Sequence, residues 1–148
     1  TVSPKYDTLE RVREKLTMKK QRIISPHVNE PPEGTWSNCL VIGDHIHIAG
    51  LTAGGMSDKM SQVGEYEQAK EIFTRTKHLI EQAGAKMDDI VRVQIYVTDI
   101  RLREEVWKAR REFFSGDFPC STLVEVSQLA APGLKVEIDS VAIKGAGG

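Results

Sequence analysis

The periodicity of the hydrophobic residues changes from helical to strand-like within a short stretch in the middle of the sequence. A stripe at helical spacing is formed by Ala69, Ile72, Phe73, Thr76, Leu79, Ile80 and Ala83. Soon afterwards every second residue is apolar, as in Val91, Val93, Ile95 and Val97. The first pattern predicts a helix with one buried face, ended by Gly84 as a C′ residue, and the second predicts a strand with one face on a core. The chain must therefore fold as a sheet against which at least one helix packs.

The segments on either side of this pair follow the same two patterns. Residues 37–42 and 45–49 are short β-prone runs, and Gly43-Asp44 between them suits the turn of a β-hairpin. A second helix is predicted after the central strand, with one side formed by Leu102, Val106, Ala109 and Phe113. Two further strands are predicted, at 122–126 and 135–143.

The order of these segments is hairpin, helix, strand, helix, strand pair. We therefore predict an α+β fold, a two-layer sandwich in which a mixed β-sheet carries both helices on one face. In the last two strands, the residues expected to face the helices are Val124, Val126, Val136 and Ile138. The opposite face of the sheet then carries Glu125, Glu137 and Asp139. A partly polar sheet face of this kind predicts contact with another subunit and a cavity between the two.

Two segments precede the hairpin. Asp7 and Glu10 are placed like an N-cap and its capping-box partner, at the start of a short helix whose apolar residues are Leu9, Val12 and Leu16. We predict that residues 1–20 form a helical extension and that residues 21–148 form the main domain. The prolines of residues 25–36 predict a surface loop without ladder hydrogen bonds, which leads to Trp36.

The composition is that of an ordinary globular protein of one domain, with 148 residues and a mass of 16.5 kDa. Lys and Arg number 20 against 21 Asp and Glu, and they are mixed with these acids rather than clustered, so no nucleic-acid partner is expected. Cys39 and Cys120 lack the spacing of a zinc site and are expected to be reduced thiols in a cytoplasmic protein. The chain has no apolar run of the length that spans a bilayer, so membrane insertion is not expected.

Several short motifs also resemble those of a known family, in the same order along the chain. The first two are Gly34-Thr35-Trp36-Ser37 and the stretch from Ile42-Gly43-Asp44 to Ala49-Gly50. Around the central helix the matching residues are Gln68, Ala83-Gly84-Ala85 and Asp89-Ile90-Val91. The remaining pieces are Val97-Thr98-Asp99, Phe113-Phe114, Phe118-Pro119, Val124-Glu125-Val126 and Val136-Glu137-Ile138. Together, from about Arg22 to Ile143, these pieces resemble the Rid family, also called YjgF or L-PSP.

The resemblance implies a chorismate-mutase-like fold and a homotrimer with small-molecule substrates in clefts between subunits. Family deaminases hydrolyse imines and enamines there, and the arginine of an F-P-x-R-S motif grips the substrate's carboxylate. In this chain Ser121 stands at that arginine's position. An arginine makes two charge-assisted hydrogen bonds to a carboxylate, whereas a serine makes one neutral bond. At about 1.5 to 3 kcal/mol per charged bond, binding of a simple 2-imino acid should weaken by several orders of magnitude.

Other site positions of the family have matches here. Glu137 matches the acidic residue that holds the attacking water, and it is the expected catalytic residue. Trp36 replaces a pocket tyrosine, and Gly50 matches a glycine whose backbone N–H faces the ligand. With Ser121, the expected substrate-binding residues are Trp36, Gly50, Thr52 and Cys120. No cofactor or metal is expected.

Each of these residues also has a purely structural interpretation. Glu137 would then form an interface ion pair, with Arg92 or with a base of another subunit, Ser121 would bond local backbone, and Cys120 would be a small buried residue rather than a nucleophile. Trp36 would be a core or interface residue.

Two other pairs of residues have two interpretations of the same kind. His45 and His47 share one strand face, as a metal site would require, but no third ligand is evident. Arg75 and Arg110 stand where either could replace the missing positive charge, although we expect both to be solvated residues of a helix face.

Two classes of function remain open. One is a hydrolase or deaminase of the Rid superfamily that acts on a substrate other than simple 2-imino acids, with Glu137 positioning water. The other is a ligand-binding or regulatory trimer that has lost catalysis. RNA cleavage is a third and weaker possibility, which the charge distribution disfavours.

Overall fold

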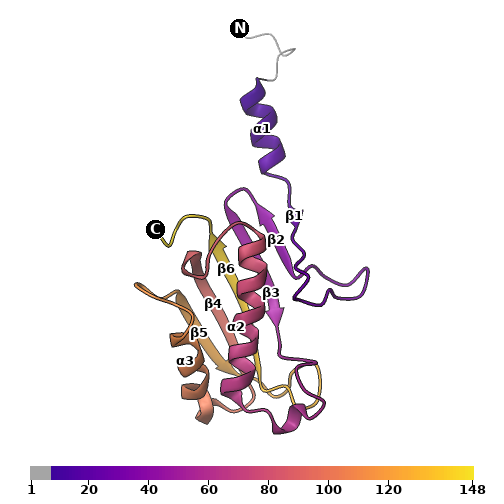
Figure 1. The fold of residues 1–148 in the computed structure, drawn as a ribbon, viewed down its shortest axis with the longest axis vertical. Coiled ribbons are helices and arrows are strands. Elements are labelled where there is room, and N and C mark those ends of the chain that lie inside the picture. Colours follow the sequence, from indigo (N-terminus) through magenta and orange to yellow (C-terminus); the bar gives the residue numbers. More distant parts are fainter. Residues whose placement is uncertain (1–7) are drawn as a thin grey trace.

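The computed structural model describes residues 8–148, apart from the side chains of residues 15–17, and its core is a mixed sheet of six strands. The strand order across the sheet is β1-β2-β3-β6-β4-β5. The strands are β1 (Gln21–Arg22), β2 (Cys39–Ile42), β3 (His45–Leu51), β4 (Ile90–Val97), β5 (Cys120–Glu125) and β6 (Val136–Ile143). Figure 1 shows helix α2 in front of the sheet, with its axis roughly along the strands.

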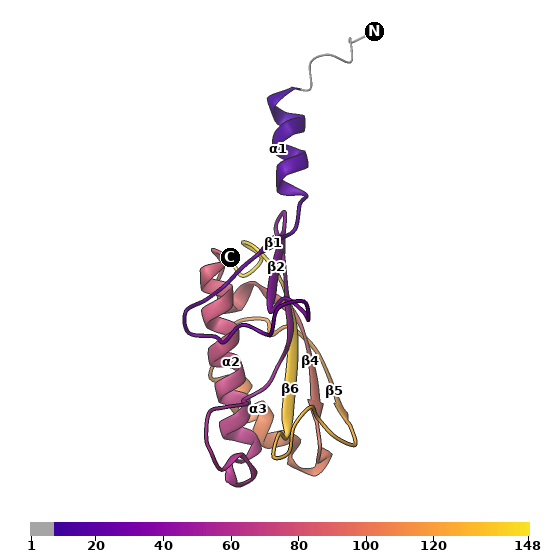
Figure 2. The same ribbon diagram turned by 90° about the vertical axis from the view of Figure 1, so that its right-hand side faces the viewer.

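Helices α2 (Glu65–Gln82) and α3 (Arg103–Arg111) lie side by side on the same face of the sheet (Figure 2). The predicted stripe of α2 faces the core, with its largest apolar members, Ile72, Phe73, Leu79 and Ile80, all fully buried. Gly84 follows the helix with a φ of 83°, as a C′ residue requires. Short 3-10 helices occupy Met60–Gln62, Met87–Asp89 and Ile100–Leu102. The two-layer α+β architecture is therefore confirmed.

Strands β2 and β3 form the predicted hairpin, with Ile42 opposite His45. Gly43 has a φ of 59°, the positive value that the first position of a type II′ turn needs. Strand β1, which the sequence analysis did not predict, adds two residues to the outer edge of β2.

Strands β5 and β6 are not neighbours, so the predicted strand pair is wrong. Strand β4 lies between them, parallel to β5 and antiparallel to β6. The physical reason is the helical crossover: α3 connects β4 to β5, and a strand that returns through a helix pairs in parallel with the strand it left.

The predicted orientation of β5 is also wrong, by one residue. Leu123 pairs with Ile95 and packs against the core, whereas Val124 pairs with Tyr96 and is 42% exposed. Glu125 therefore lies on the side of the helices and not on the opposite face. Strand β5 is at the edge of the sheet, where most of its side chains are exposed, so its apolar pattern carries little information on which face is buried.

Strand β6 has the predicted orientation. Val136, Ile138 and Ala142 are fully buried on the side of the helices, and the half-buried Glu137 and Asp139 alternate with them on the other side. No helix among residues 8–148 covers this second face (Figure 2).

Helix α1 (Leu9–Thr17) lies beyond the end of the sheet (Figure 1). Its N-cap is Thr8, whose hydroxyl accepts a hydrogen bond from the backbone N–H of Arg11 at 3.4 Å. The predicted cap, Asp7, lies outside the described residues. Leu9 is 86% exposed, so in this chain alone the apolar side of α1 has little to pack against.

A buried glutamine connects helix α2 to the loop before β6. The amide nitrogen of Gln68 donates to the carbonyls of Gly133 at 2.9 Å and Val63 at 3.1 Å, and its oxygen accepts from the backbone N–H of Lys135 at 2.9 Å. Gln68 is fully buried, and water cannot replace these partners. This side chain therefore fixes the start of β6, the strand that carries Glu137.

We expect Gln68→Met to lower the free energy of unfolding by about 3 kcal/mol, because two partly buried backbone groups of residues 133 and 135 lose their hydrogen bonds to a fully buried side chain. Urea unfolding at fixed protein concentration measures the change. The matched control is Gln82→Met at the exposed end of the same helix, for which we expect a change within about 0.5 kcal/mol. Equal effects of the two substitutions would contradict the proposed role of Gln68.

Candidate functional site

Glu137 lies in the middle of strand β6, opposite Tyr96 of β4, on the sheet face away from the helices. Burial raises the pKa of its carboxyl group, and the negative charge of Asp139 raises it further. Asp139 accepts a hydrogen bond from the Tyr96 hydroxyl at 3.0 Å. None of the ion pairs found among residues 8–148 includes Glu137, so the alternative of a pair with Arg92 within the chain is not observed.

Gly50 allows the Glu137 side chain to lie against strand β3. The β3–β6 register shifts between Ile48 and Leu51, which places Gly50 in an irregular part of the strand. A Cβ atom at Gly50 would overlap Oε1 of Glu137 and lie 3.0 Å from its Cδ. The absence of a side chain at position 50 therefore makes room for the carboxylate.

A cavity of about 140 Å³ borders Gly50. It is lined by Val28, Asn29, Trp36, Asn38, Gly50, Leu51, Thr52, Gly54 and Arg75. The indole N–H of Trp36 donates to Oδ1 of Asn38 at 3.2 Å, and the amide of Asn38 donates to the carbonyl of Asn29 at 2.9 Å. These bonds hold the Trp36 ring in place although 55% of the residue is exposed. The structure thus brings Trp36, Gly50 and Thr52 together at one cavity. Glu137 is not one of its lining residues, but its carboxylate lies against Gly50, which is.

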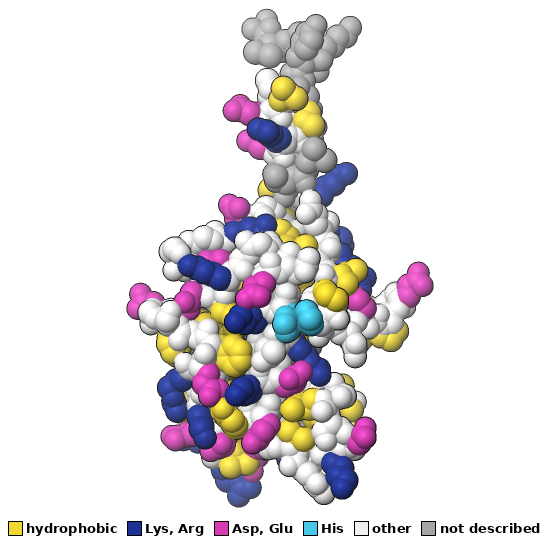
Figure 3. All heavy atoms as spheres, viewed as in Figure 1, with side chains coloured by type: hydrophobic (Ala, Val, Ile, Leu, Met, Phe, Trp, Pro, Cys, Tyr) yellow, Lys and Arg dark blue, Asp and Glu magenta, His cyan; other side chains and the backbone are white. Residues whose placement is uncertain are grey.

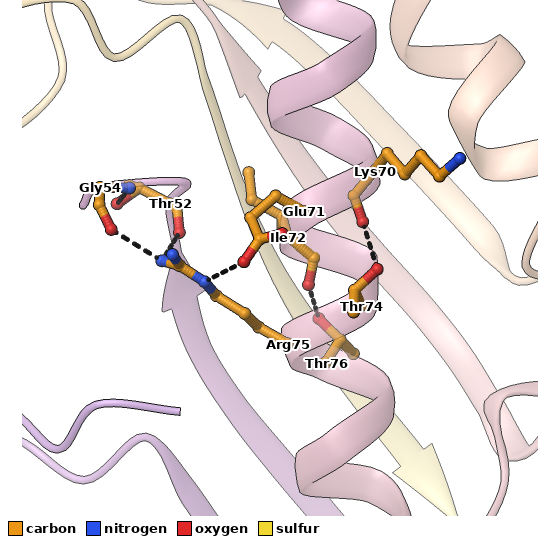
Figure 4. A network of polar contacts seen from close by, with 8 residues as sticks. All are labelled: Thr52, Gly54, Lys70, Glu71, Ile72, Thr74, Arg75 and Thr76. Carbon is orange, nitrogen blue, oxygen red and sulfur yellow. Dashed lines mark hydrogen bonds and ion pairs between the residues drawn. The ribbon is translucent and has the colours of Figure 1, made fainter. Parts of the chain in front are cut away.

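Arg75 is not the solvated residue that we expected. Figure 4 shows its side chain extending from α2 toward the loop after β3. Its Nη1 donates to the carbonyls of Thr52 at 2.8 Å and Gly54 at 3.0 Å, and its Nε donates to Oε1 of Glu71 at 2.9 Å. Arg75 therefore holds the loop that forms one wall of the cavity.

Arg110 is also not a solvated residue. It leaves α3 toward β5, and its Nη1 donates to the hydroxyl of Ser121 at 3.0 Å. Burial lowers the pKa of its guanidinium, and the charge of Arg111 lowers it further. A second cavity of about 350 Å³ lies here, lined by Ile100, Arg103, Trp107, Arg110, Ser121 and Leu123.

The predicted site residues thus fall into two separate groups in one chain. Ser121 pairs with the buried Val93 and faces the helices, whereas Glu137 faces the other side of the sheet, on β6 beyond β4. Cys120, the residue before Ser121, points away from the Ser121 cavity and is an exposed free thiol. The interpretation of Cys120 as a small buried residue is therefore wrong for the single chain.

His45 and His47 lie on one face of β3 as predicted, with ring centroids 6.4 Å apart. Among residues 8–148, no group of three or more His, Cys, Asp or Glu residues is placed to hold a metal ion. In the same part of the chain, no helix is long and apolar enough to cross a membrane.

Asn38, Arg103 and Trp107 are among the residues of the two cavities that the sequence analysis missed. Positions 103, 107 and 110 lie on one side of a helix by their spacing, and this signal could have indicated that two arginines and a tryptophan share a surface. Asn38 gave no such signal, because its role depends on a hydrogen bond to a residue of the preceding loop.

Comparison by sequence with known proteins finds a family model and relatives that match most of the chain. Residues 27–144 match the family model described as Endoribonuclease L-PSP. A 2-iminobutanoate/2-iminopropanoate deaminase from Dermatophagoides farinae is 28% identical over 127 residues, which cover 85% of this chain and 98% of that protein. A RutC family protein from Aquifex aeolicus is 30% identical over 115 residues, which cover 76% of this chain and 91% of that protein.

Solved structures agree with this result. A protein of unknown function from Pseudomonas aeruginosa is 34% identical with a TM-score of 0.80, over 86% of this chain and 94% of that one. A member of the YjgF/YER057c/UK114 family from Mycobacterium tuberculosis is 31% identical with a TM-score of 0.67, over 84% of this chain and 99% of that one. The chain therefore belongs to the Endoribonuclease L-PSP family, also called the Rid or YjgF family, as its motifs predicted.

Proposed function

We propose that this chain is a hydrolase that deaminates an imine, an enamine or a related small molecule, other than the simple 2-imino acids. The placement of Glu137 is the observation that carries this proposal. Its carboxylate lies against Gly50, one of the residues that line a cavity, has a raised pKa, and has no cationic partner in the described chain. A carboxylate of this kind is suited to accept a proton from water near neutral pH.

The proposed reaction needs no cofactor. The oxygen of a water molecule forms a bond to the carbon of the C=N group while Glu137 takes one proton from that water. Glu137 gives that proton to the nitrogen, which yields a carbinolamine. Transfer of the remaining hydroxyl proton to the nitrogen, again through Glu137, lets the C=O bond form as the C–N bond breaks, so a carbonyl compound and ammonia leave. A backbone N–H near Gly50 would stabilise the charge that develops, and Trp36 and Thr52 would form the wall of the pocket.

We further propose that the working site is formed between two subunits of a homotrimer. The two groups of site residues face opposite sides of the sheet in one chain, and one small substrate cannot contact both. The sheet face opposite the helices is free of covering elements among residues 8–148, so a second copy has room to pack there. The Ser121 cavity of one subunit would then meet the Glu137 and Trp36 group of its neighbour.

The proposal that the substrate is not a simple 2-imino acid rests on Ser121. A hydroxyl at this position cannot form the two charged hydrogen bonds that an arginine would offer to the carboxylate of a 2-imino acid. The related deaminase from Dermatophagoides farinae is named for 2-imino acids, and this chain is only 28% identical to it.

A second candidate function is a trimer that binds a ligand without turnover, which the open cavities would equally allow. RNA cleavage has less support. Acidic and basic side chains are interspersed over the face shown in Figure 3, and the formal net charge is -1, whereas binding to phosphate backbones depends on clustered positive charge.

We expect Glu137→Gln to reduce turnover at least about a hundredfold, as loss of a general base does. The assay generates imines in situ with amino-acid or amine oxidases and follows ammonia release. The imines include 2-imino acids, imines of ω-amino acids and uncharged imines. We expect turnover of the second or third class, and rapid clearance of 2-imino acids at substoichiometric protein would contradict the proposed substrate change.

The matched control for this assay is Glu104→Gln on the exposed side of α3, which should leave turnover unchanged. Light scattering should show the same trimer for the wild type and both variants. If ligands bind but no imine is turned over by the wild type, the chain is the non-catalytic trimer. A stable monomer at micromolar concentration would contradict the site between subunits.

We expect Gly50→Ala to reduce turnover about tenfold or more while it changes the free energy of unfolding by less than about 1 kcal/mol. The added Cβ displaces the carboxylate of Glu137, which is the end of a flexible side chain and can move at little cost. Gly50 does not have a positive φ, so alanine fits the backbone. Urea unfolding and the imine assay measure the two effects, and unchanged turnover would argue against the importance of this carboxylate position.

The stability of the protein should also depend on pH through Glu137. Its pKa is higher in the folded chain than the value of about 4.3 for an unfolded one. The folded state therefore binds this proton more tightly, and stability falls as pH rises from about 4 through the folded-state pKa. We expect Glu137→Gln to raise the Tm relative to the wild type at pH 8 and not at pH 4. Thermal unfolding from pH 4 to pH 8 measures this effect. A Tm difference between variant and wild type that stayed constant over that range would contradict a raised pKa of Glu137.

A further inference from the structure

We propose that the substrate of the proposed hydrolase is an uncharged aromatic imine, whose ring stacks on the indole of Trp36 while its C=N group lies toward Glu137. Trp36 is then the residue that sets the specificity of the site. The inference rests on the proposed function for the reaction itself and adds the class of substrate to it.

The indole of Trp36 offers a ligand apolar ring surface and no free donor. Its one polar group, the Nε1–H, donates to Oδ1 of Asn38 at 3.2 Å, and Asn38 is buried. Trp36 itself is 55% exposed, so an apolar ring lies open at the surface of the chain while its donor points inward. Contact between this ring and a flat ligand is favourable, because it removes apolar surface from water on both sides.

Hydrogen bonds also fix the backbone near this ring. Nη2 of Arg22 donates to the carbonyl of Trp36 at 3.3 Å, and the hydroxyl of Thr35 donates to the carbonyl of Pro32. A side chain that is already held in place loses little conformational freedom when a ligand binds. Trp36 is therefore preorganised as the flat wall of a site.

The cavity beside Trp36 has room for one ring. Its volume is about 140 Å³, and a cavity of about 150 Å³ accepts a benzene molecule. Stacking of two aromatic rings adds about two- to tenfold in affinity beyond the effect of the area that they bury. Gly50 lines the same cavity, and the Glu137 carboxylate lies against Gly50, so a ring bound here places its substituent near Glu137.

The charges around this cavity favour an uncharged ligand. Arg75 is the cationic side chain among the lining residues in the described part of the chain, and Glu71 already pairs with it at 2.9 Å. Figure 4 shows its guanidinium group directed at Glu71 and at the carbonyls of Thr52 and Gly54. The carboxylate of Glu137 repels an anion. An imine without an acid group therefore fits this cavity better than an imino acid does.

The binding experiment titrates benzamide and cyclohexanecarboxamide into the isotopically labelled wild-type protein and follows the indole N–H signals by NMR. Both probes are uncharged amides that carry one ring, and only the ring of benzamide is flat and aromatic. Trp36→Phe identifies the signal of Trp36, since the chain has 2 tryptophans. We expect benzamide to shift this signal and to bind about threefold or more tighter than cyclohexanecarboxamide.

Trp36→Leu tests the ring itself, because leucine keeps an apolar side chain without an aromatic face. We expect the dissociation constant for benzamide to rise about fivefold or more in this variant, and that for cyclohexanecarboxamide to change about twofold or less. Trp36→Phe keeps an aromatic ring and should bind benzamide within about threefold of the wild type. The matched control is Phe118→Leu, which removes a ring that is 42% exposed outside this cavity and should leave both dissociation constants unchanged.

The turnover experiment compares the imines that an amine oxidase makes from benzylamine and from cyclohexylmethylamine. We expect kcat/KM for the aromatic imine to exceed that for the saturated one in the wild type. Trp36→Leu should lower kcat/KM for the aromatic imine about fivefold or more and leave the value for the saturated imine within about twofold. A purely structural role of Trp36 would lower both values equally.

Equal binding of the two amides to the wild type would overturn the proposal, and so would equal losses of benzamide binding in Trp36→Leu and Phe118→Leu. A Trp36 signal that benzamide leaves unshifted would overturn it as well, because the ring would then be covered in the assembled protein. If benzamide binds through Trp36 but no imine is hydrolysed, the hydrolase proposal fails and the aromatic binding site stands. If imines are hydrolysed and Trp36→Leu acts equally on both, only the aromatic preference fails.

Discussion

Strand β6 joins the two halves of the sheet through hydrogen bonds to β3 on one side and β4 on the other. In its first half, fully buried Val136 and Ile138 alternate with half-buried Glu137 and Asp139, so one strand closes the core and presents Glu137. The buried amide of Gln68 fixes the point at which this strand begins. The position of the candidate catalytic carboxylate is therefore a consequence of core packing and not of a flexible loop.

The two candidate binding regions are supported in different ways. Around Trp36, the hydrogen bond that Trp36 donates to Asn38 and those that Arg75 donates to Thr52 and Gly54 hold the walls of the cavity. Around Ser121, two arginines approach one tryptophan without a carboxylate partner. The polar groups of the first region have hydrogen-bond partners within the chain. In the second region, no carboxylate of the described chain pairs with the positive charge.

The elements in which a regular hydrophobic pattern continues over many residues could be predicted from the sequence. Helix α2, strand β4 and the hairpin have patterns that local propensity and burial support together, and their positions were confirmed. Strand β5 was placed correctly but its faces were interchanged, because an edge strand with mostly exposed side chains lacks the alternation on which the prediction depends. The pairing of β5 with β4 is set by the α3 crossover, which no local pattern of β5 records.

The sequence was sufficient to identify the family, the two-layer architecture and Glu137 on the sheet face opposite the helices, because periodicity and short motifs are properties of neighbouring residues. It was not sufficient to place Arg75 and Arg110, which we expected in solvent. Their long side chains cross from a helix to a loop or strand far away in the chain, and such contacts exist only after the layers have packed. Tertiary structure therefore decided where the positive charge lies, and with it the chemistry that the cavity beside Ser121 can accept.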